Sequence, residues 1–410
     1  MASELRTVLV VGTGLIGTSV ALALRGHGVR VLLSDRDQGA MRLARELGAG
    51  EEWQPRLAAG RATAAGADGV TDGADGVTGA GAGGTDGVTG AGADGTGDMT
   101  GAGVGAERAD LAVIAVPPAH VATELLALQR AGAATHYTDV ASVKAVPIDG
   151  ARRLGCDLGA YVASHPLAGR EKSGPGAARA DLFLGRPWAL CPTPESSPET
   201  RAAVLRLVEL CGANPVEVHA DDHDRAVAVV SHAPHVTASA VAARLADASE
   251  VALGLAGQGV RDVTRIAGSD PGLWLGILAG NAAPVAEVLE AVSRDLSEAA
   301  SALRALADGD GTASGEITQL LKRGVAGHGR IPGKHGGPAS SYVVVQVVIG
   351  DRPGQLAKLF QVCDEVGVNV EDVRLEHAPG LPLGIAEVSV QPDAAPVLTR
   401  ALHERGWQVP

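Results

Sequence analysis

Residues Thr7 to Asp35 read TVLVVGTGLIGTSVALALRGHGVRVLLSD, and this stretch is the strongest indication of the fold of the N-terminal half. Thr7–Val11 is a short run of β-branched and apolar residues that predicts a buried strand. Leu15–Arg25 predicts a helix, and Val29–Ser34 predicts a second strand. A strand, a helix and a strand in this order indicate the first unit of a parallel sheet.

Three glycines join the first strand to the helix in the pattern G-x-G-x-x-G, at Gly12, Gly14 and Gly17. The first permits a tight turn, the second lets a pyrophosphate approach the backbone, and the third lets the helix pack on the strand. The amides at the helix N-terminus then face the anion. A glycine turn in another doubly wound domain would explain the glycines but not the acid at the end of the second strand, Asp35. The pattern therefore predicts a dinucleotide site.

Asp35 also indicates which dinucleotide binds. A carboxylate at this position can accept hydrogen bonds from the adenosine ribose hydroxyls, and it repels a 2′-phosphate. The sequence favours NAD, although the cation next door, Arg36, leaves NADP open.

The sheet is expected to continue across residues 1–220. Leu111–Val116 and the run that begins at His136–Asp139 predict further buried strands, and Pro187–Pro192 could form the last strand of the domain. Strands that alternate with helices predict an α/β fold with a Rossmann-type, doubly wound parallel sheet. Residues 62–106 lack Lys and Arg and repeat glycine and aspartate, which predicts a disordered surface insertion.

The composition of residues 221–410 divides them into three segments. Residues 221–308 are rich in Ala, Leu and Val at helical spacing, which predicts an all-helical substrate and dimerisation domain. Its long apolar faces with few aromatic residues suggest a homodimer. Residues 309–339 are rich in Gly and basic residues and are expected to form a mobile linker. Residues 340–410 return to strands and helices in the order βαββαβ, which predicts a ferredoxin-like module.

Composition excludes several classes of protein. A formal net charge of −13 and 2% aromatic residues argue against a nucleic-acid partner. No stretch approaches the length of apolar chain that spans a bilayer, and the N-terminus lacks the pattern of a signal peptide. The four cysteines form no CxxC pair, which argues against a zinc site or a disulfide framework and favours the cytoplasm.

Two loops of the sheet domain carry candidate catalytic groups. DVASVK follows a strand, where doubly wound folds bind ligands, so Ser142 is a candidate hydrogen-bonding group, although a lone serine in a turn is equally compatible. In SHPLAGREKSG, His165 precedes Pro166, which disfavours the α region and places the imidazole on a rigid corner. An ordinary histidine is mostly neutral at physiological pH and can accept a proton.

The helical region carries two further candidates. His232 and His235 share a helix face, but no nearby carboxylates complete a metal site, so no metal is expected and a substrate or packing contact is favoured. Arg265 lies in an otherwise apolar helix. It could pair with Asp262, or it could clamp a carboxylate with two parallel hydrogen bonds.

Together, the motifs GxGLIGxS, DxxSVK, SHPxAGxEKSG, HDRxVAxxSHxPH and DxTRIAxSDPxxW resemble the prephenate/arogenate dehydrogenase family of tyrosine biosynthesis. The resemblance runs from Val8 to about Leu306, apart from the insertion. The C-terminal motifs DRPGQLAKLF and GVNVEDV resemble an ACT domain, a small amino-acid-sensing fold.

The resemblance implies roles for individual residues. His165 would accept the proton of the substrate ring hydroxyl, Ser142 would bridge that hydroxyl and the nicotinamide, and Arg265 would hold the ring carboxylate. Three residues would line or gate the pocket: His235, Glu171 and Trp274. The cofactor site would comprise Gly12, Gly14, Leu15, Ile16, Gly17, Asp35, Val116 and Pro117. An amino-acid effector would bind at Asp351, Pro353, Gly354 and Asn369.

The implied reaction is the NAD-dependent oxidative decarboxylation of prephenate to 4-hydroxyphenylpyruvate, and arogenate is the alternative substrate. Two other classes remain. The β-hydroxyacid dehydrogenases combine similar domains but use a lysine in the helical domain, and residues 221–306 contain none. A non-catalytic ACT sensor would not need Ser142, His165 and Arg265 together. For the ACT module, tyrosine binding and a purely structural dimerising role both remain open.

Overall fold

The computed structural model describes residues 4–54, 108–169, 173–331, 342–377 and 382–410. The predicted insertion at residues 62–106 and the predicted pocket residue Glu171 lie outside the described residues.

The N-terminal part is built on an eight-stranded sheet in the order β3-β2-β1-β4-β5-β6-β7-β8. All neighbouring strands are parallel except β6 and β7. The predicted doubly wound sheet is therefore confirmed. The strands are β1 (Thr7–Val11), β2 (Arg30–Ser34), β3 (Glu51–Glu52), β4 (Ala109–Ile114), β5 (Ala134–Asp139), β6 (Tyr161–Pro166), β7 (Pro187–Cys191) and β8 (Asn214–Glu217).

The structure differs from the sequence prediction at the far edge of this sheet. The strand predicted at Pro187–Pro192 is β7, but it runs antiparallel to β6, and β8 lies beyond it. Strand β6 was not predicted from the sequence. Its residues are almost all buried, but the apolar run is short and ends in His-Pro, which indicated a rigid corner instead. His165 is in fact the penultimate residue of β6.

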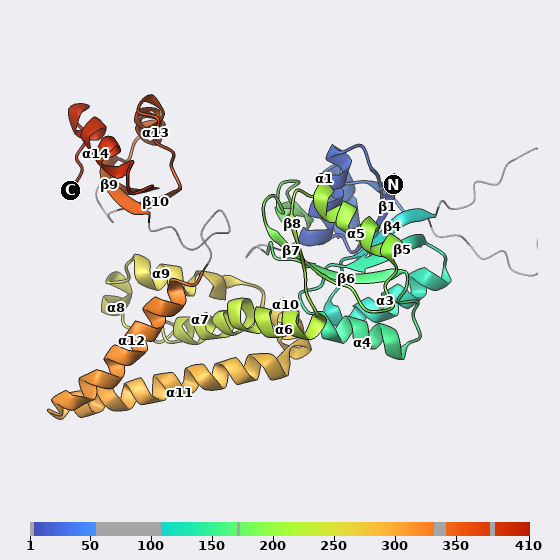
Figure 1. Ribbon diagram of the computed structural model, residues 1–410, viewed down its shortest axis with the longest axis horizontal. Helices are drawn as coiled ribbons and strands as arrows, with labels where there is room; N and C mark the ends of the chain where they lie inside the picture. Colours follow the sequence, from blue (N-terminus) through green and yellow to red (C-terminus); the bar gives the residue numbers. More distant parts are fainter. Residues whose placement is uncertain (1–3, 55–107, 170–172, 332–341, 378–381) are drawn as a thin grey trace, which may run out of the picture. The chain divides into compact units, whose positions relative to one another are not determined.

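Helices cover both faces of the sheet (Figure 1). One apolar core joins the sheet to α1 (Leu15–Gly26), α2 (Gln38–Glu46) and α5 (Pro198–Leu210). The other joins it to α3 (Pro118–Arg130) and α4 (Ala145–Arg153). Because both faces are covered, the strands are almost continuously buried, which explains their unbroken apolar runs. A short turn of 3-10 helix, η1 (Pro175–Ala177), contacts α1 and α2.

The first compact unit comprises residues 1–227 and 269–282, so it includes α6 (Ala220–Val227) and α10 (Pro271–Gly280). The Asn281 side-chain amide donates to the Asp224 carbonyl oxygen at 2.7 Å. Gly280 lies so close to Val143 that an added Cβ would come within 2.9 Å of it. This division differs from the predicted boundary at residue 220, which was drawn where the strand pattern stops.

The helices of the second unit follow from residue 228. They are η2 (Ala228–His232, a π-helical turn), α7 (Ala233–Ala243), α8 (Glu250–Gly254), α9 (Gln258–Thr264), η3 (Arg265–Gly268), α11 (Ala282–Ala307), η4 (Gly311–Ala313) and α12 (Ser314–His328). Helix α12 lies within the stretch that was expected to be a mobile linker, and it corrects that expectation for residues 314–328. Its Ile317, Leu321 and Val325 recur at helical spacing, and Arg323 pairs with Asp295 of α11 at 2.8 Å.

One helical run among the described residues, residues 220–243, is long and apolar enough to cross a membrane. The bent pair α10 and α11 meets the same criterion if it is counted as one segment. Length and composition alone are weak grounds, because the core helix of a soluble protein has the same properties. The expectation of no membrane partner therefore stays a prediction.

The C-terminal module is a separate antiparallel sheet in the order β10-β11-β9, with its own apolar core. An isolated antiparallel bridge joins Val348 of β9 to Gln408, in the segment where the last strand was predicted. This arrangement confirms the predicted ferredoxin-like βαββαβ fold. Its elements are β9 (Val343–Gly350), α13 (Gln355–Glu365), β10 (Asp372–His377), β11 (Leu383–Val390) and α14 (Ala395–Glu404).

Candidate active site

The turn between β1 and α1 has the shape that a dinucleotide requires. Gly12 has φ +98°, and a Cβ there would lie 2.3 Å from the Ala115 carbonyl oxygen. A Cβ on Gly17 would lie 1.9 Å from the Gly12 oxygen, so the helix could not approach the strand. A Cβ on Gly14, by contrast, would meet nothing within 4 Å. The backbone of Gly14 thus borders open space at the N-terminus of α1, where a pyrophosphate fits.

Asp35 ends β2 and is held against this turn. Its Oδ2 accepts a hydrogen bond from the Thr13 hydroxyl at 2.7 Å, and its Oδ1 accepts one from the Asp37 amide at 2.8 Å. The neighbouring cation, Arg36, instead pairs with Glu124 of α3 at 3.2 Å. The position that would contact a ribose is therefore acidic, and the adjacent cation is engaged elsewhere.

The other predicted cofactor residues lie at the same edge of the sheet. Leu15 and Ile16 begin α1, and both are partly buried. Val116 and Pro117 follow β4, the strand next to β1, and Pro117 caps α3. Sheet order reverses between β1 and β4, and this is where doubly wound folds bind nucleotides.

A buried polar network fixes the ends of β5 and β6. Lys144 is fully buried, and its ammonium group donates to Asp139 Oδ1 and, at 2.6 Å, to the Ser164 carbonyl oxygen. The Tyr161 hydroxyl donates to Asp139 Oδ2 at 2.6 Å. Burial, reinforced by the Asp139 charge, raises the pKa of Tyr161 well above its usual value, so the phenol stays a donor. The network holds the loops that carry Ser142 and His165.

His165 lies in a second chain of hydrogen bonds. Its Nδ1 is 3.0 Å from Nε2 of His223, and the two rings meet edge to face with centroids 5.1 Å apart. His223 Nδ1 is in turn 2.8 Å from Oδ1 of Asp224. His223 and Asp224 are buried, with 3% and 4% of their surface exposed. The sequence motif HDRxVAxxSHxPH contains both residues, yet no role was predicted for them.

Ser142 lies in the loop after β5 and His165 lies near the end of β6, and these two strands are parallel neighbours. Asp139 of β5 pairs with Ala163 of β6, so the loop after β5 and the end of β6 share one edge of the sheet. That edge is also the one that carries the glycine turn after β1. The structure therefore brings the predicted base, the predicted hydroxyl and the nucleotide turn to the same edge of the first unit.

The second unit carries Arg265 and His235. Arg265 is exposed at the end of α9, and Asp262, its alternative partner, instead accepts a hydrogen bond from Gln258 at 3.0 Å. Among the salt bridges of the described residues none involves Arg265, which is consistent with a guanidinium available for a ligand. His235 is 7% exposed, and burial lowers its pKa. The imidazole is therefore mostly neutral near pH 7.

The remaining predicted residues are placed as follows. Trp274 lies on α10, in the first unit, and is half-buried. In the C-terminal module, Asp351, Pro353 and Gly354 line a cavity of about 500 Å³. Asn369 is not among the residues that line that cavity, and its side-chain amide donates to Glu371 at 2.8 Å.

Comparison with known proteins shows which family has this architecture. The family description "Prephenate dehydrogenase, nucleotide-binding domain" matches residues 89–217, and "Prephenate dehydrogenase, dimerization domain" matches residues 219–322. A probable prephenate dehydrogenase, NovF, from Streptomyces niveus is 37% identical over 408 residues, which cover 98% of this chain and 99% of NovF.

The chain belongs to the prephenate dehydrogenase family.

Membership confirms that the chain is an oxidoreductase with a nucleotide cofactor, and it rules out the non-catalytic sensor and the β-hydroxyacid dehydrogenase alternatives. Prephenate dehydrogenase of Bacillus subtilis is 24% identical and covers 70% of this chain and 78% of its own length. The matched dimerization domain continues into α12, in line with a helix where a linker was expected.

Solved structures agree on the fold. A prephenate dehydrogenase from Aquifex aeolicus, in complex with hydroxyphenyl propionate and NAD+, has a TM-score of 0.57 at 22% identity, covering 79% of this chain and 100% of that one. An arogenate dehydrogenase from Synechocystis has a TM-score of 0.54 at 23% identity, covering 78% and 98%. Enzymes named for either substrate thus share this architecture.

Proposed function

We propose that the chain catalyses the NAD-dependent oxidative decarboxylation of prephenate to 4-hydroxyphenylpyruvate. The observation that carries the proposal is the placement of His165, a histidine hydrogen-bonded through Nδ1, on the same sheet edge as the glycine turn. Bound NAD would accept a hydride from the ring carbinol carbon. Gly12, Gly14 and Asp35 would hold the dinucleotide at the turn after β1.

Side chains of the protein would transfer the proton and bind the ring carboxylate. His165 would take the proton of the ring hydroxyl as the carbonyl forms, with Ser142 hydrogen-bonded to the same oxygen. Loss of the ring carboxylate as CO2 aromatises the ring, and His165 would return the proton to the phenol oxygen. Arg265 would orient that carboxylate through paired hydrogen bonds. Because the protein is acidic overall, binding of an anionic substrate must depend on such local cations.

Arogenate is the second candidate substrate, because an arogenate dehydrogenase shares the fold. Steady-state kinetics of the purified chain with prephenate and with arogenate, each with NAD and with NADP, test the proposal. We expect the highest kcat/KM with prephenate and NAD. A higher kcat/KM with arogenate would reassign the substrate, and no nucleotide reduction with either would refute the proposal.

Cofactor choice is expected to depend on the charge of Asp35. Asp35→Asn keeps an acceptor for Thr13 but removes the negative charge, so we expect KM for NAD to rise about tenfold, the value of roughly one charged hydrogen bond. Discrimination against NADP should fall at the same time, because the repulsion of the 2′-phosphate is lost. Asp149→Ser, on the exposed surface of α4, is the control and should change neither KM. Unchanged selectivity in Asp35→Asn would contradict this role.

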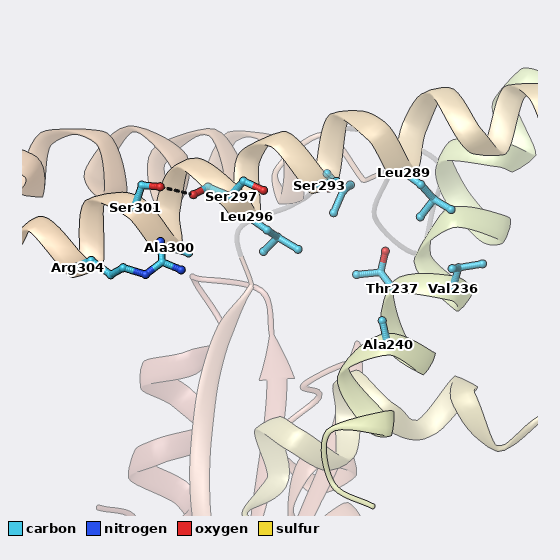
Figure 2. Close-up of a pocket in the computed structure, with 11 residues that line it drawn as sticks. Val236, Thr237, Ala240, Leu289, Ser293, Leu296, Ser297, Ala300, Ser301 and Arg304 are labelled. Atoms are coloured by element: carbon cyan, nitrogen blue, oxygen red, sulfur yellow. Dashed lines mark hydrogen bonds between the residues drawn. The ribbon is translucent and has the colours of Figure 1, made fainter.

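Dimerisation through the helical domain is also part of the proposal. A groove of about 530 Å³ lies between α7 and α11, and Figure 2 shows Leu289 and Leu296 of α11 facing the groove opposite Val236 of α7. Leu296 and Leu303 of α11 are more than half exposed, which is costly in water. We infer that a second copy covers them, as the name of the matched domain suggests. Light scattering should give twice the mass of one chain, and the mass of a single chain would contradict the inference.

For the C-terminal module we propose an ACT-type effector site that binds tyrosine in the cavity at Asp351–Gly354. Ala357→Trp would fill the cavity from α13, so we expect it to abolish the rise in Tm caused by tyrosine while kcat without tyrosine is unchanged. Lys358→Trp, the neighbouring exposed position outside the cavity lining, should keep the response. No response of the native chain to any of the twenty amino acids would leave the module a structural role only.

The four cysteines all lie in the described part of the chain as free, buried thiols, which supports a cytoplasmic location. Fractionation of the native host that found the protein outside the cytoplasm would contradict this assignment.

A further inference from the structure

Asp224 is a buried carboxylate whose oxygens receive only donors. Oδ1 accepts the Lys144 amide at 2.8 Å, and Oδ2 accepts the Ala145 amide at 2.9 Å, so the side chain sits at the N-terminus of α4. An ionised carboxylate can accept but not donate. Any further group that forms a hydrogen bond to Oδ1 must therefore be the donor.

The group on that side is His223 Nδ1, at 2.8 Å. His223 Nδ1 must carry the hydrogen, which leaves the acceptor lone pair of the neutral ring on Nε2. That Nε2 faces His165 Nδ1 at 3.0 Å, so His165 in turn donates from Nδ1. The hydrogen-bond chain thus sets both tautomers and puts the acceptor lone pair of His165 on Nε2.

The opposite tautomer of His165 conflicts with this geometry. With its proton on Nε2, His165 would present a lone pair at Nδ1 to the lone pair of His223 Nε2 at 3.0 Å. The His223 ring cannot turn readily, because it is buried and its Nδ1 is hydrogen-bonded to Asp224. The three residues of this hydrogen-bond chain, His165, His223 and Asp224, all belong to the first compact unit.

We propose that His223 and Asp224 are positioning residues that make His165 a base: they fix its tautomer and stabilise the imidazolium formed when it takes the substrate proton. The inference rests on the proposed function, in which His165 accepts that proton at Nε2. The positive charge on His165 is stabilised by the hydrogen bond from its Nδ1 to His223. His223 in turn donates to the Asp224 carboxylate, which carries the opposite charge. A serine protease triad uses the same principle with one histidine fewer.

The kinetic test compares His223→Leu with His223→Gln in the full chain. Leucine removes the acceptor that faces His165, so kcat should fall about 10- to 100-fold, as for partners that orient a reactive histidine elsewhere. Glutamine offers an amide oxygen in place of Nε2 and should keep kcat within about threefold of the native value. KM for the substrate and Kd for NADH should stay within about twofold in both variants, which a merely structural defect would not allow. His219→Leu, exposed just before α6, is the matched control and should be silent.

A second readout needs no substrate. In chain labelled with 15N-histidine, and with His165→Asn used for assignment, the ring nitrogen shifts should show protonated Nδ1 and unprotonated Nε2 for both His165 and His223. Equal kcat for the leucine variant and the native chain, equal loss in both variants, or a His165 proton on Nε2 would overturn the proposal. Lack of turnover by the native chain would instead refute the proposed function. The ring nitrogen shifts would still show whether the hydrogen-bond chain fixes the tautomers of His165 and His223.

Discussion

Replacing His165 by asparagine is expected to lower kcat by about 100- to 10,000-fold, the range that a positioned general base contributes. The asparagine amide can still donate toward His223, but it cannot take the ring hydroxyl proton as the carbonyl forms. Because the lost interaction develops in the transition state, kcat and kcat/KM should fall together while KM changes little. The measurement is steady-state NADH formation over a range of substrate concentrations.

The variant should fold, because His165 is only half-buried at the end of β6 and the Lys144 network is left intact. Its Kd for NADH, followed by nucleotide fluorescence, should match that of the native chain. His27→Asn, an exposed histidine at the end of α1, provides the matched control. Turnover at the native rate by His165→Asn would show that another group is the base.

Sequence predicted best the features that local steric rules impose. Gly12 and Gly17 are required because a Cβ at either would collide with backbone oxygen, so the glycine pattern alone locates the turn. The ferredoxin-like module was equally predictable, because its strand-like and helix-like segments follow one another in the order βαββαβ.

The features that sequence did not predict depend on contacts between distant residues. Asp139 and Lys144 flank Ser142 in DVASVK, but only the folded chain shows that both are buried and bonded to the end of β6. His223 meets His165 across 58 positions of sequence, so its role could not follow from local pattern. Helix α12 was missed because glycines and basic residues near its end outweighed its apolar spacing.

The strongest effect on substrate binding is expected from Arg265→Ala. Loss of a guanidinium that binds a carboxylate removes about 1.5–3 kcal/mol, so KM for prephenate should rise roughly 10- to 100-fold. The carboxylate is bound in the ground state as well as in the transition state, so kcat should change by less than about threefold. Because Arg265 is exposed, the variant should keep the native Tm.

Arg261→Ala provides the matched control, since it removes an exposed arginine from α9, the helix that Arg265 caps, and should leave KM unchanged. Arg265→Lys keeps the charge but not the planar pair of donors, and its KM should lie between those of the native chain and the alanine variant. Arg265 belongs to the second compact unit and His165 to the first. An increase in KM from the Arg265 variant and a loss of kcat from the His165 variant, with the same substrate, would separate carboxylate binding from proton transfer. If Arg265→Ala instead left KM unaltered, the carboxylate must be held by a different cation.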